Sequence, residues 1–143
     1  FGDPEAQVVL PLLEGDLAAV LARAAAGELS GCAGALTLSA DRTVGVVMAS
    51  GGYPGAFERG LLIEGLDVAA AAPGVWVFHA GTACRDGLLV TDGGRVLAVV
   101  GRAPTYEGAR SRAYVAVDRI RFAGAHVRRD IGRRALPFDP PAR

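Results

Sequence analysis

The sequence predicts an α+β fold with a mostly antiparallel sheet built of hairpins and with helices packed on one face of it. Short β-rich runs separated by turn residues fill the middle of the chain, over residues 31–103. Apolar residues at helical spacing mark both ends. Hydrophobic residues make up 51% of the 143, which is enough for a buried core. These three observations together favour one compact α+β domain, preceded by helices.

Two short helices are expected before the sheet. Asp-Pro-Glu at residues 3–5 is a helix-start signal, and a short apolar helix over 6–13, strained by its internal proline, follows it. Asp16 is a second candidate cap. Apolar residues then recur at helical spacing over 17–24, and Gly27 is the expected stop.

The middle of the chain is typical of strands joined by tight turns. Residues 33–39 and 43–49 are expected to pair as one hairpin, and residues 88–91 and 95–100 as a second. The remaining expected elements are a loop at 50–55, a short strand at 61–63, a helical turn at 68–72 and a strand at 75–79.

The longest expected helix begins at Pro104. Its apolar stripe has members three or four positions apart: Tyr106, Ala109, Ala113, Val117 and Ile120. Gly124 is the expected end of this helix. Residues 137–143 are rich in proline and are expected to be a loose tail.

Composition excludes several classes of protein. The fifteen basic residues, all Arg, balance fifteen acidic ones, so bulk charge indicates neither a nucleic-acid partner nor a membrane partner. The longest apolar run is too short and broken to span a bilayer, and no signal peptide is evident. A cytoplasmic location is therefore expected. The chain starts at Phe1 without Met, and we expect upstream sequence to be missing.

A segment at a helix start and a loop that follows a buried strand have polar or flexible residues that suit binding. Asp3 and Glu5 could bind a metal or an amino group, but helix capping is the favoured alternative. The loop containing Gly51, Gly52 and Tyr53 could hold a phosphate on its backbone amides, with charge from Arg59. The alternative for that loop is a tight connection with a packed tyrosine.

Two further residues, His79 and Arg95, and one basic cluster also have chemistry that suits binding. His79 ends a strand, where it could face a cleft, although a hydrogen-bonded structural histidine is the commoner case. Arg95 follows two glycines and suits bidentate phosphate binding, unless it is a solvated charge after a turn. The basic cluster at 128–134 is best explained as a solvated or ion-paired tail. No residues have zinc-ligand spacing, and no metal site is predicted within this chain.

Six segments are specific when taken in this order and spacing: Phe1-Gly2-Asp3-Pro4-Glu5 with Gln7, Ala49-Ser50-Gly51-Gly52-Tyr53-Pro54, His79-Ala80-Gly81-Thr82, Gly93-Gly94-Arg95-Val96-Leu97 with Val99, Ala113-Tyr114, and Arg129-Asp130-Ile131-Gly132. Together they resemble the C-terminal portion of phosphoribosylamine–glycine ligases, which are ATP-grasp enzymes. The resemblance extends from Phe1 to about Leu136.

The resemblance implies a part of a purine-biosynthetic ligase that joins glycine to 5-phosphoribosylamine. ATP would activate the glycine carboxylate as glycyl phosphate, with Mg²⁺ or Mn²⁺ on the nucleotide phosphates. In the family, a Glu-x-Asn-x-Arg run that holds the metal directly precedes Phe-Gly-Asp-Pro-Glu. That run would lie upstream of this chain, so we expect the isolated chain to be inactive and to bind ATP negligibly.

The resemblance also implies a domain division and residue roles. Residues 1–30 would complete the ATP-grasp domain, and residues 31–136 would form the family's C-terminal domain. Asp3 and Glu5 would face the glycine or amine side of the cleft as catalytic residues. The other implied residues would bind substrate, with Arg95 on the phosphate: Gly51, Gly52, Tyr53, Arg59, His79, Thr82 and Arg95.

Two other functions remain open at this point. One is a binding or interaction module that uses the same fold without ATP chemistry. The other is a different ATP-grasp ligase, although that group is not expected to share His79-Ala80-Gly81-Thr82. Partners under the main reading are the two small substrates and the remaining ATP-grasp domains, with no nucleic acid and no membrane.

Overall fold

The computed structural model describes residues 2–139, and its centre is a four-stranded sheet in the order β4-β7-β3-β8. The strands are β3 (Arg42–Ala49), β4 (Val75–His79), β7 (Arg95–Ala103) and β8 (His126–Val127). Every neighbouring pair is antiparallel, as predicted. The fold class is therefore confirmed as α+β with antiparallel sheets.

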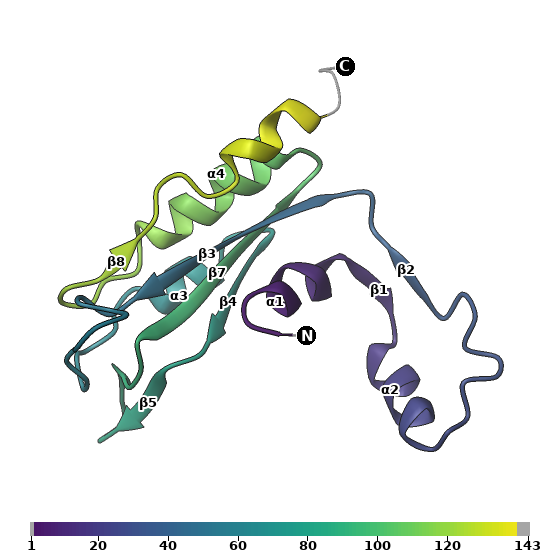
Figure 1. Ribbon diagram of the computed structural model, residues 1–143, viewed down its shortest axis with the longest axis horizontal. Coiled ribbons are helices and arrows are strands. Elements are labelled where there is room, and N and C mark those ends of the chain that lie inside the picture. The colour runs from purple at the N-terminus through teal and green to yellow at the C-terminus, as the bar shows by residue number, and fades with distance from the viewer. Residues whose placement is uncertain (1, 140–143) are drawn as a thin grey trace.

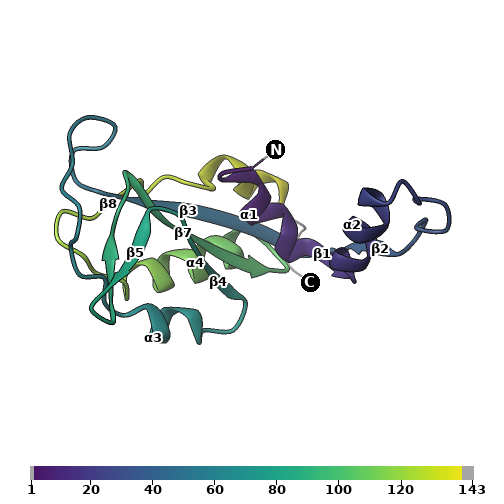
Figure 2. The ribbon, with the colours of Figure 1, turned by 90° about the horizontal axis from the view of Figure 1, so that it is seen from below.

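One face of the sheet is covered by α3 (Leu66–Ala70) and α4 (Tyr106–Val117) (Figure 2). The Thr105 side chain caps α4 by accepting from the backbone N–H of Gly108. The predicted apolar stripe is confirmed, since Ala109, Ala113 and Val117 are all buried. They pack on the central strand β7, and the helix ends at Val117 rather than at Gly124.

The first helix lies on the opposite face, which corrects the prediction that the helices share one face. It consists of α1 (Glu5–Val9) followed by a 3-10 turn, η1 (Leu10–Leu12), instead of a continuous helix over 6–13. The Thr43 hydroxyl donates to the Val8 carbonyl at 2.6 Å. A Cβ on Gly45 would lie 2.6 Å from Val8 Cγ1, so only glycine lets the helix approach β3 this closely.

A small unit projects from the main body (Figure 1). It contains β1 (Leu13–Gly15), α2 (Leu17–Ala25) and β2 (Leu36–Leu38). The Asp16 side chain caps α2 by accepting from the N–H of Ala19 at 2.9 Å, as predicted. Although α2 is strongly apolar, none of its residues is buried.

The first predicted hairpin is wrong, because β2 pairs with β1 and not with β3. Arg102 of β7 holds the junction between them. Its guanidinium donates to Asp41 at 2.7 Å, to the Ser39 hydroxyl at 2.6 Å and to the Pro11 carbonyl at 2.7 Å. The chain therefore passes straight from β2 into the central sheet instead of turning back, and both edges of β3 pair elsewhere.

The second predicted hairpin is also wrong. The partner of β6 (Leu88–Thr91) is β5 (Thr82–Arg85), through a turn at Asp86 and Gly87 whose φ angles are both positive. The expected strand at 61–63 is reduced to an isolated bridge between Leu62 and Val90. Short apolar runs with turn residues on both sides do not identify their partners, so β6 paired with the preceding strand instead of the following one.

The expected tail divides into two parts. Residues 140–143 and Phe1 lie outside the described residues. Within the described part, Phe138 ends a 3-10 helix, η2 (Arg133–Phe138), and the Asp139 carboxylate accepts from the backbone N–H groups of Tyr106 and Glu107. Within residues 2–139, no helix combines the length and the apolarity needed to cross a membrane.

Candidate functional site

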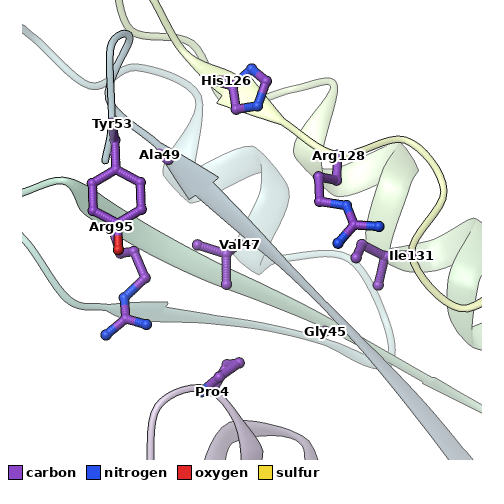
Figure 3. Close-up of a pocket in the computed structure, with 9 residues that line it drawn as sticks. All are labelled: Pro4, Gly45, Val47, Ala49, Tyr53, Arg95, His126, Arg128 and Ile131. Atoms are coloured by element: carbon purple, nitrogen blue, oxygen red, sulfur yellow. The ribbon is translucent and has the colours of Figure 1, made fainter. Parts of the chain in front are cut away.

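A hollow of about 400 Å³ lies on the face of the sheet that α3 and α4 leave open (Figure 3). Its floor is β3, its walls come from β7 and from the segment around β8, and the turn before α1 closes one end. The lining residues are Pro4, Gly45, Val47, Ala49, Tyr53, Arg95, His126, Arg128 and Ile131.

The floor follows from strand alternation along β3. Val44, Val46 and Met48 point into the core beneath α4, so the residues between them point to the opposite face. Those are Gly45, Val47 and Ala49, all small or apolar. The floor therefore offers no charge, and the polar chemistry of the hollow belongs to its walls.

A β-bulge gives Arg95 its direction. Met48 pairs with Leu97, but the next residue, Ala49, pairs with Arg95 and skips Val96. Val96 and Leu97 are both part of the core, so the extra residue turns Arg95 to the face of Ala49. With regular alternation from Leu97, the Arg95 side chain would point toward the core.

Asp3 meets this arginine directly. The Asp3 carboxylate lies 2.6 Å from Arg95 Nη2, and both side chains are half exposed. No side-chain cap is formed at the start of α1, so the capping role favoured for Asp3 is not realised. The structure thus joins two of the predicted site residues, 92 positions apart (95 − 3), at the edge of the hollow.

Glu5 lies nearby, but its exposed side chain is engaged in the turn before α1. Its carboxylate accepts from the backbone N–H of Gly2 at 2.7 Å. This hydrogen bond holds the pKa of Glu5 below its ordinary value. Glu5 therefore stabilises the turn before α1, and it does not line the hollow.

The two glycine loops predicted as candidates lie against each other. The Ser50 hydroxyl donates to the Gly93 carbonyl, and the Ser50 N–H donates to the Gly94 carbonyl, both at 2.8 Å. The Tyr53 ring packs on Gly94, where a Cβ would lie 2.2 Å from Tyr53 Cδ2. Tyr53 is thereby held beside Arg95 on the same wall (Figure 3).

The neighbouring glycines of the first loop have structural reasons to be glycine. Gly52 has a φ of +93°, and a Cβ there would lie 2.2 Å from the Ala56 carbonyl oxygen. A Cβ on Gly51 would lie 2.7 Å from the Gly124 carbonyl oxygen. Both positions shape the turn that delivers Tyr53, and neither lines the hollow.

The opposite wall holds residues that the sequence did not single out as a site. His126 is paired with Ala49 in β8, and Arg128 follows on the same face two residues later. The signal that was available is the polar-apolar-polar alternation over His126-Val127-Arg128. We interpreted residues 128–134 only as a charged tail, because nothing local assigns the alternation to a particular sheet edge.

Arg128 is paired with Asp130, as an ion-paired tail predicts. Arg128 donates through Nε at 3.1 Å and through Nη2 at 2.7 Å to the two carboxylate oxygens. These hydrogen bonds hold the pKa of Asp130 below its ordinary value and raise the pKa of Arg128. Each arginine of the hollow thus has a carboxylate partner from its own chain.

Three other predicted residues lie outside the hollow. His79 Nδ1 lies 3.1 Å from the Thr82 hydroxyl, and alternation along β4 puts His79 on the side of the sheet opposite to Arg95. The Arg59 guanidinium stacks on Phe57, 5.6 Å from the ring centroid, and the Phe57 ring in turn makes an edge-to-face contact with Tyr53. The structure therefore groups Asp3, Tyr53 and Arg95 but not His79, Thr82 or Arg59.

Among residues 2–139, no group of three or more His, Cys, Asp and Glu side chains lies close enough together to hold a metal ion. Of the acidic residues near the hollow, Asp3 and Asp130 are engaged with arginines and Glu5 with the Gly2 N–H. These residues do not fit a Mg²⁺ or Mn²⁺ site, and the hollow suits an anion.

The comparisons with known proteins agree with one another. A family model described as phosphoribosylglycinamide synthetase, C domain, matches residues 43–134, which is more than half of the chain. Phosphoribosylamine–glycine ligase, chloroplastic, from Arabidopsis thaliana is 52% identical over 138 residues, covering 95% of this chain and 26% of that protein. The Pseudomonas aeruginosa phosphoribosylamine–glycine ligase is 45% identical over 136 residues, covering 95% of this chain and 31% of that protein.

A solved structure is similar in fold as well as in sequence. The crystal structure of phosphoribosylamine–glycine ligase from Thermotoga maritima, at 2.30 Å resolution, superposes with a TM-score of 0.68 and 35% sequence identity. The match covers 91% of this chain and 31% of that chain. The chain thus spans between 26% and 31% of the length of these three proteins.

Proposed function

The chain belongs to the phosphoribosylglycinamide synthetase family, and on that premise we propose that it forms the C-terminal wall of the substrate site of an ATP-dependent ligase. That ligase joins glycine to 5-phosphoribosylamine. The observation that carries the proposal is the pair of arginines, Arg95 and Arg128, on opposite walls of one hollow with an apolar floor.

The chemistry of the hollow favours a sugar phosphate over a nucleotide base or an apolar ligand. Guanidinium groups bind phosphate through paired, charge-assisted hydrogen bonds. The hollow's volume of about 400 Å³ suits a small ligand. A phosphate that enters would take the place of Asp3 on Arg95 and of Asp130 on Arg128, while the Tyr53 phenol borders the sugar.

Asp3 has a second role under this proposal. Once a phosphate occupies Arg95, the Asp3 carboxylate is free to receive the amino group of phosphoribosylamine, which is the side of the cleft expected for it. Glu5 supports the same turn through Gly2. His79, Thr82 and Arg59 remain predictions as substrate-binding residues, because their side chains lie outside the hollow.

The nucleotide chemistry belongs to the rest of the parent enzyme under this proposal. Mg·ATP or Mn·ATP, when bound there, supplies the phosphoryl group that activates the glycine carboxylate. The exposed apolar surface of α2 supports the idea that residues 1–30 complete an ATP-grasp domain with additional chain. The cytoplasm remains our proposed location for the enzyme.

The proposal is tested by measuring the binding of ribose 5-phosphate to this chain by calorimetry. Arg95→Gln should weaken binding about tenfold, since a hydrogen bond to a charged group is worth about 1.5 kcal/mol or more. Arg119→Gln, an exposed arginine beside α3, is the charge-matched control and should change nothing. An equal loss of affinity in both variants would mean that bulk charge alone explains the binding, and it would refute the site.

A second measurement separates the ligase from a module without ATP chemistry. In an assembled enzyme, Arg95→Ala should raise the KM for phosphoribosylamine far more than the KM for ATP. Equal effects on both would reject the phosphate role. Tight binding of Mg·ATP by this chain alone would contradict the proposal that the rest of the parent enzyme binds the nucleotide.

A further inference from the structure

Tyr114 does not line the hollow, yet its hydroxyl holds the wall that does. We define the strap as residues 128–131, which follow the end of β8. The Tyr114 hydroxyl donates to the Arg128 carbonyl at 2.7 Å and accepts from the Ile131 N–H at 3.1 Å. A single side-chain oxygen on α4 therefore bridges both ends of the strap.

Arg110, one turn earlier on α4, supplies two further backbone contacts of the strap. It donates through Nε to the Ile131 carbonyl and through Nη2 to the Arg129 carbonyl, both at 3.0 Å. Its guanidinium stacks on the Tyr114 ring at 4.8 Å, and Arg129 stacks there at 5.7 Å. Tyr114 is thus at the centre of the contacts between the helix and the strap.

Backbone pairing with the sheet does not hold the strap, because the pairing of β8 with β3 ends at Val127, and only the Ile131 side chain packs against the core. The first and last residues of the strap, Arg128 and Ile131, both line the hollow. Their positions depend on backbone groups that Tyr114 and Arg110 bind from behind. The strap therefore connects α4, on one side of the sheet, with the hollow on the other side.

We propose that Tyr114, supported by Arg110, is a positioning residue that holds Arg128 across the hollow from Arg95. This inference rests on the proposed sugar-phosphate site. Tyr114 never touches the ligand; it sets the backbone from which the Arg128 guanidinium reaches it. A tyrosine that merely filled space would need its ring and not its hydroxyl.

The test removes only the hydroxyl. Tyr114→Phe keeps the ring for Arg110, and Tyr106→Phe on the same helix is the matched control, since Tyr106 stacks under Arg42 and lies away from the strap. Affinity for ribose 5-phosphate should fall about three- to tenfold in Tyr114→Phe and in Arg128→Gln, and it should stay unchanged in Tyr106→Phe. In the Arg128→Gln background, Tyr114→Phe should cause no further loss.

A second readout does not depend on ligand. Heteronuclear NOE values of the amides of residues 128–131 should fall in Tyr114→Phe, while those of β3 stay as in the wild type. Unchanged NOE values, or additive losses of affinity in the double variant, would overturn the positioning role. Absence of binding in the wild type would instead overturn the sugar-phosphate site, and the NOE values would still decide whether Tyr114 orders the strap.

Discussion

Gly101 is the position at which a single methyl group should test how the sheet and α4 fit together. A Cβ at Gly101 would lie 2.1 Å from the Ala109 carbonyl oxygen and 2.7 Å from the Ala113 nitrogen. Ordinary contact begins at 3.4 Å, so helix and strand must separate by about 1.3 Å (3.4 − 2.1) to accommodate alanine. Both atoms belong to the helix backbone and cannot rotate away.

The magnitude follows from where the separation occurs. Ala109 and Ala113 are fully buried, and they form the contact surface between α4 and β7. Overpacking of a core costs about 1–3 kcal/mol, and we expect the upper end because no flexible side chain can absorb the added group. In a chain of this size each kcal/mol shifts Tm by about 2–4 °C. Gly101→Ala should therefore lower Tm by about 6–12 °C.

The assay is thermal unfolding followed by circular dichroism. Gly55→Ala is the control, because Gly55 lies in an exposed loop and its added Cβ would be only about 0.3 Å (3.4 − 3.1) inside ordinary contact, with the Gly52 carbonyl oxygen. We expect its Tm to stay within about 2 °C of the wild type, since surface changes rarely exceed about 0.5 kcal/mol. A Gly101→Ala variant that melts like Gly55→Ala would show that α4 does not lie as close to β7 as described.

Three further predictions concern the site and the projecting unit. Gly94→Ala should displace the Tyr53 ring, which would otherwise be 2.2 Å from the new Cβ. Because Tyr53 is 39% exposed and its ring can swing outward, we expect weaker ribose 5-phosphate binding with less than about 1 kcal/mol of lost stability, and unmoved Tyr53 ring NMR signals would contradict this. The pKa of Asp130 is lowered by Arg128, so the pair stabilises the fold at pH values above the ordinary carboxyl pKa of 3.8, and this stability is lost as the pH falls through the lower pKa of the folded state. NMR of the Asp130 carboxyl should find a titration midpoint below 3.8, and a midpoint at or above 3.8 would exclude the pairing in solution. Asp16→Ala should remove the cap of α2 at a local cost of about 1 kcal/mol, which should appear as faster hydrogen exchange of the Ala19 amide. The Tm should change little because no residue of α2 is buried, and a large drop in Tm would mean that α2 is part of the cooperative core.

Elements that depend on near neighbours were predictable. The stripe from Tyr106 to Val117 is written at helical spacing, and Thr105 caps it within the same short segment. The strand at 75–79 matches its prediction residue for residue. Local patterns such as these are set by interactions over three or four positions, which any reader of the sequence can count.

Strand pairing was not predictable from the same signals. Residues 33–39 and 43–49 resemble a hairpin around a turn, yet β3 pairs with β7 across a register that joins Arg42 to Ala103. Several apolar runs of equal length could have occupied that place. Which pairing buries the most apolar surface is a property of the whole chain, and a local pattern does not contain it.

The site, like the fold, was predictable only where it depends on local sequence. The resemblance to a family and the glycine loops before and beside Arg95 were evident from residues alone, and the prediction that Arg95 binds phosphate was made from them. The bulge at Val96 that turns Arg95 to the open face was not, and neither was Arg128 as the opposite wall. By itself, the sequence determined which residues carry charge and where the longer helices and strands lie, but it did not identify the short strands β1, β5 and β8. Only the tertiary structure decided which face each charge occupies, because one extra residue in a strand reverses every side chain beyond it.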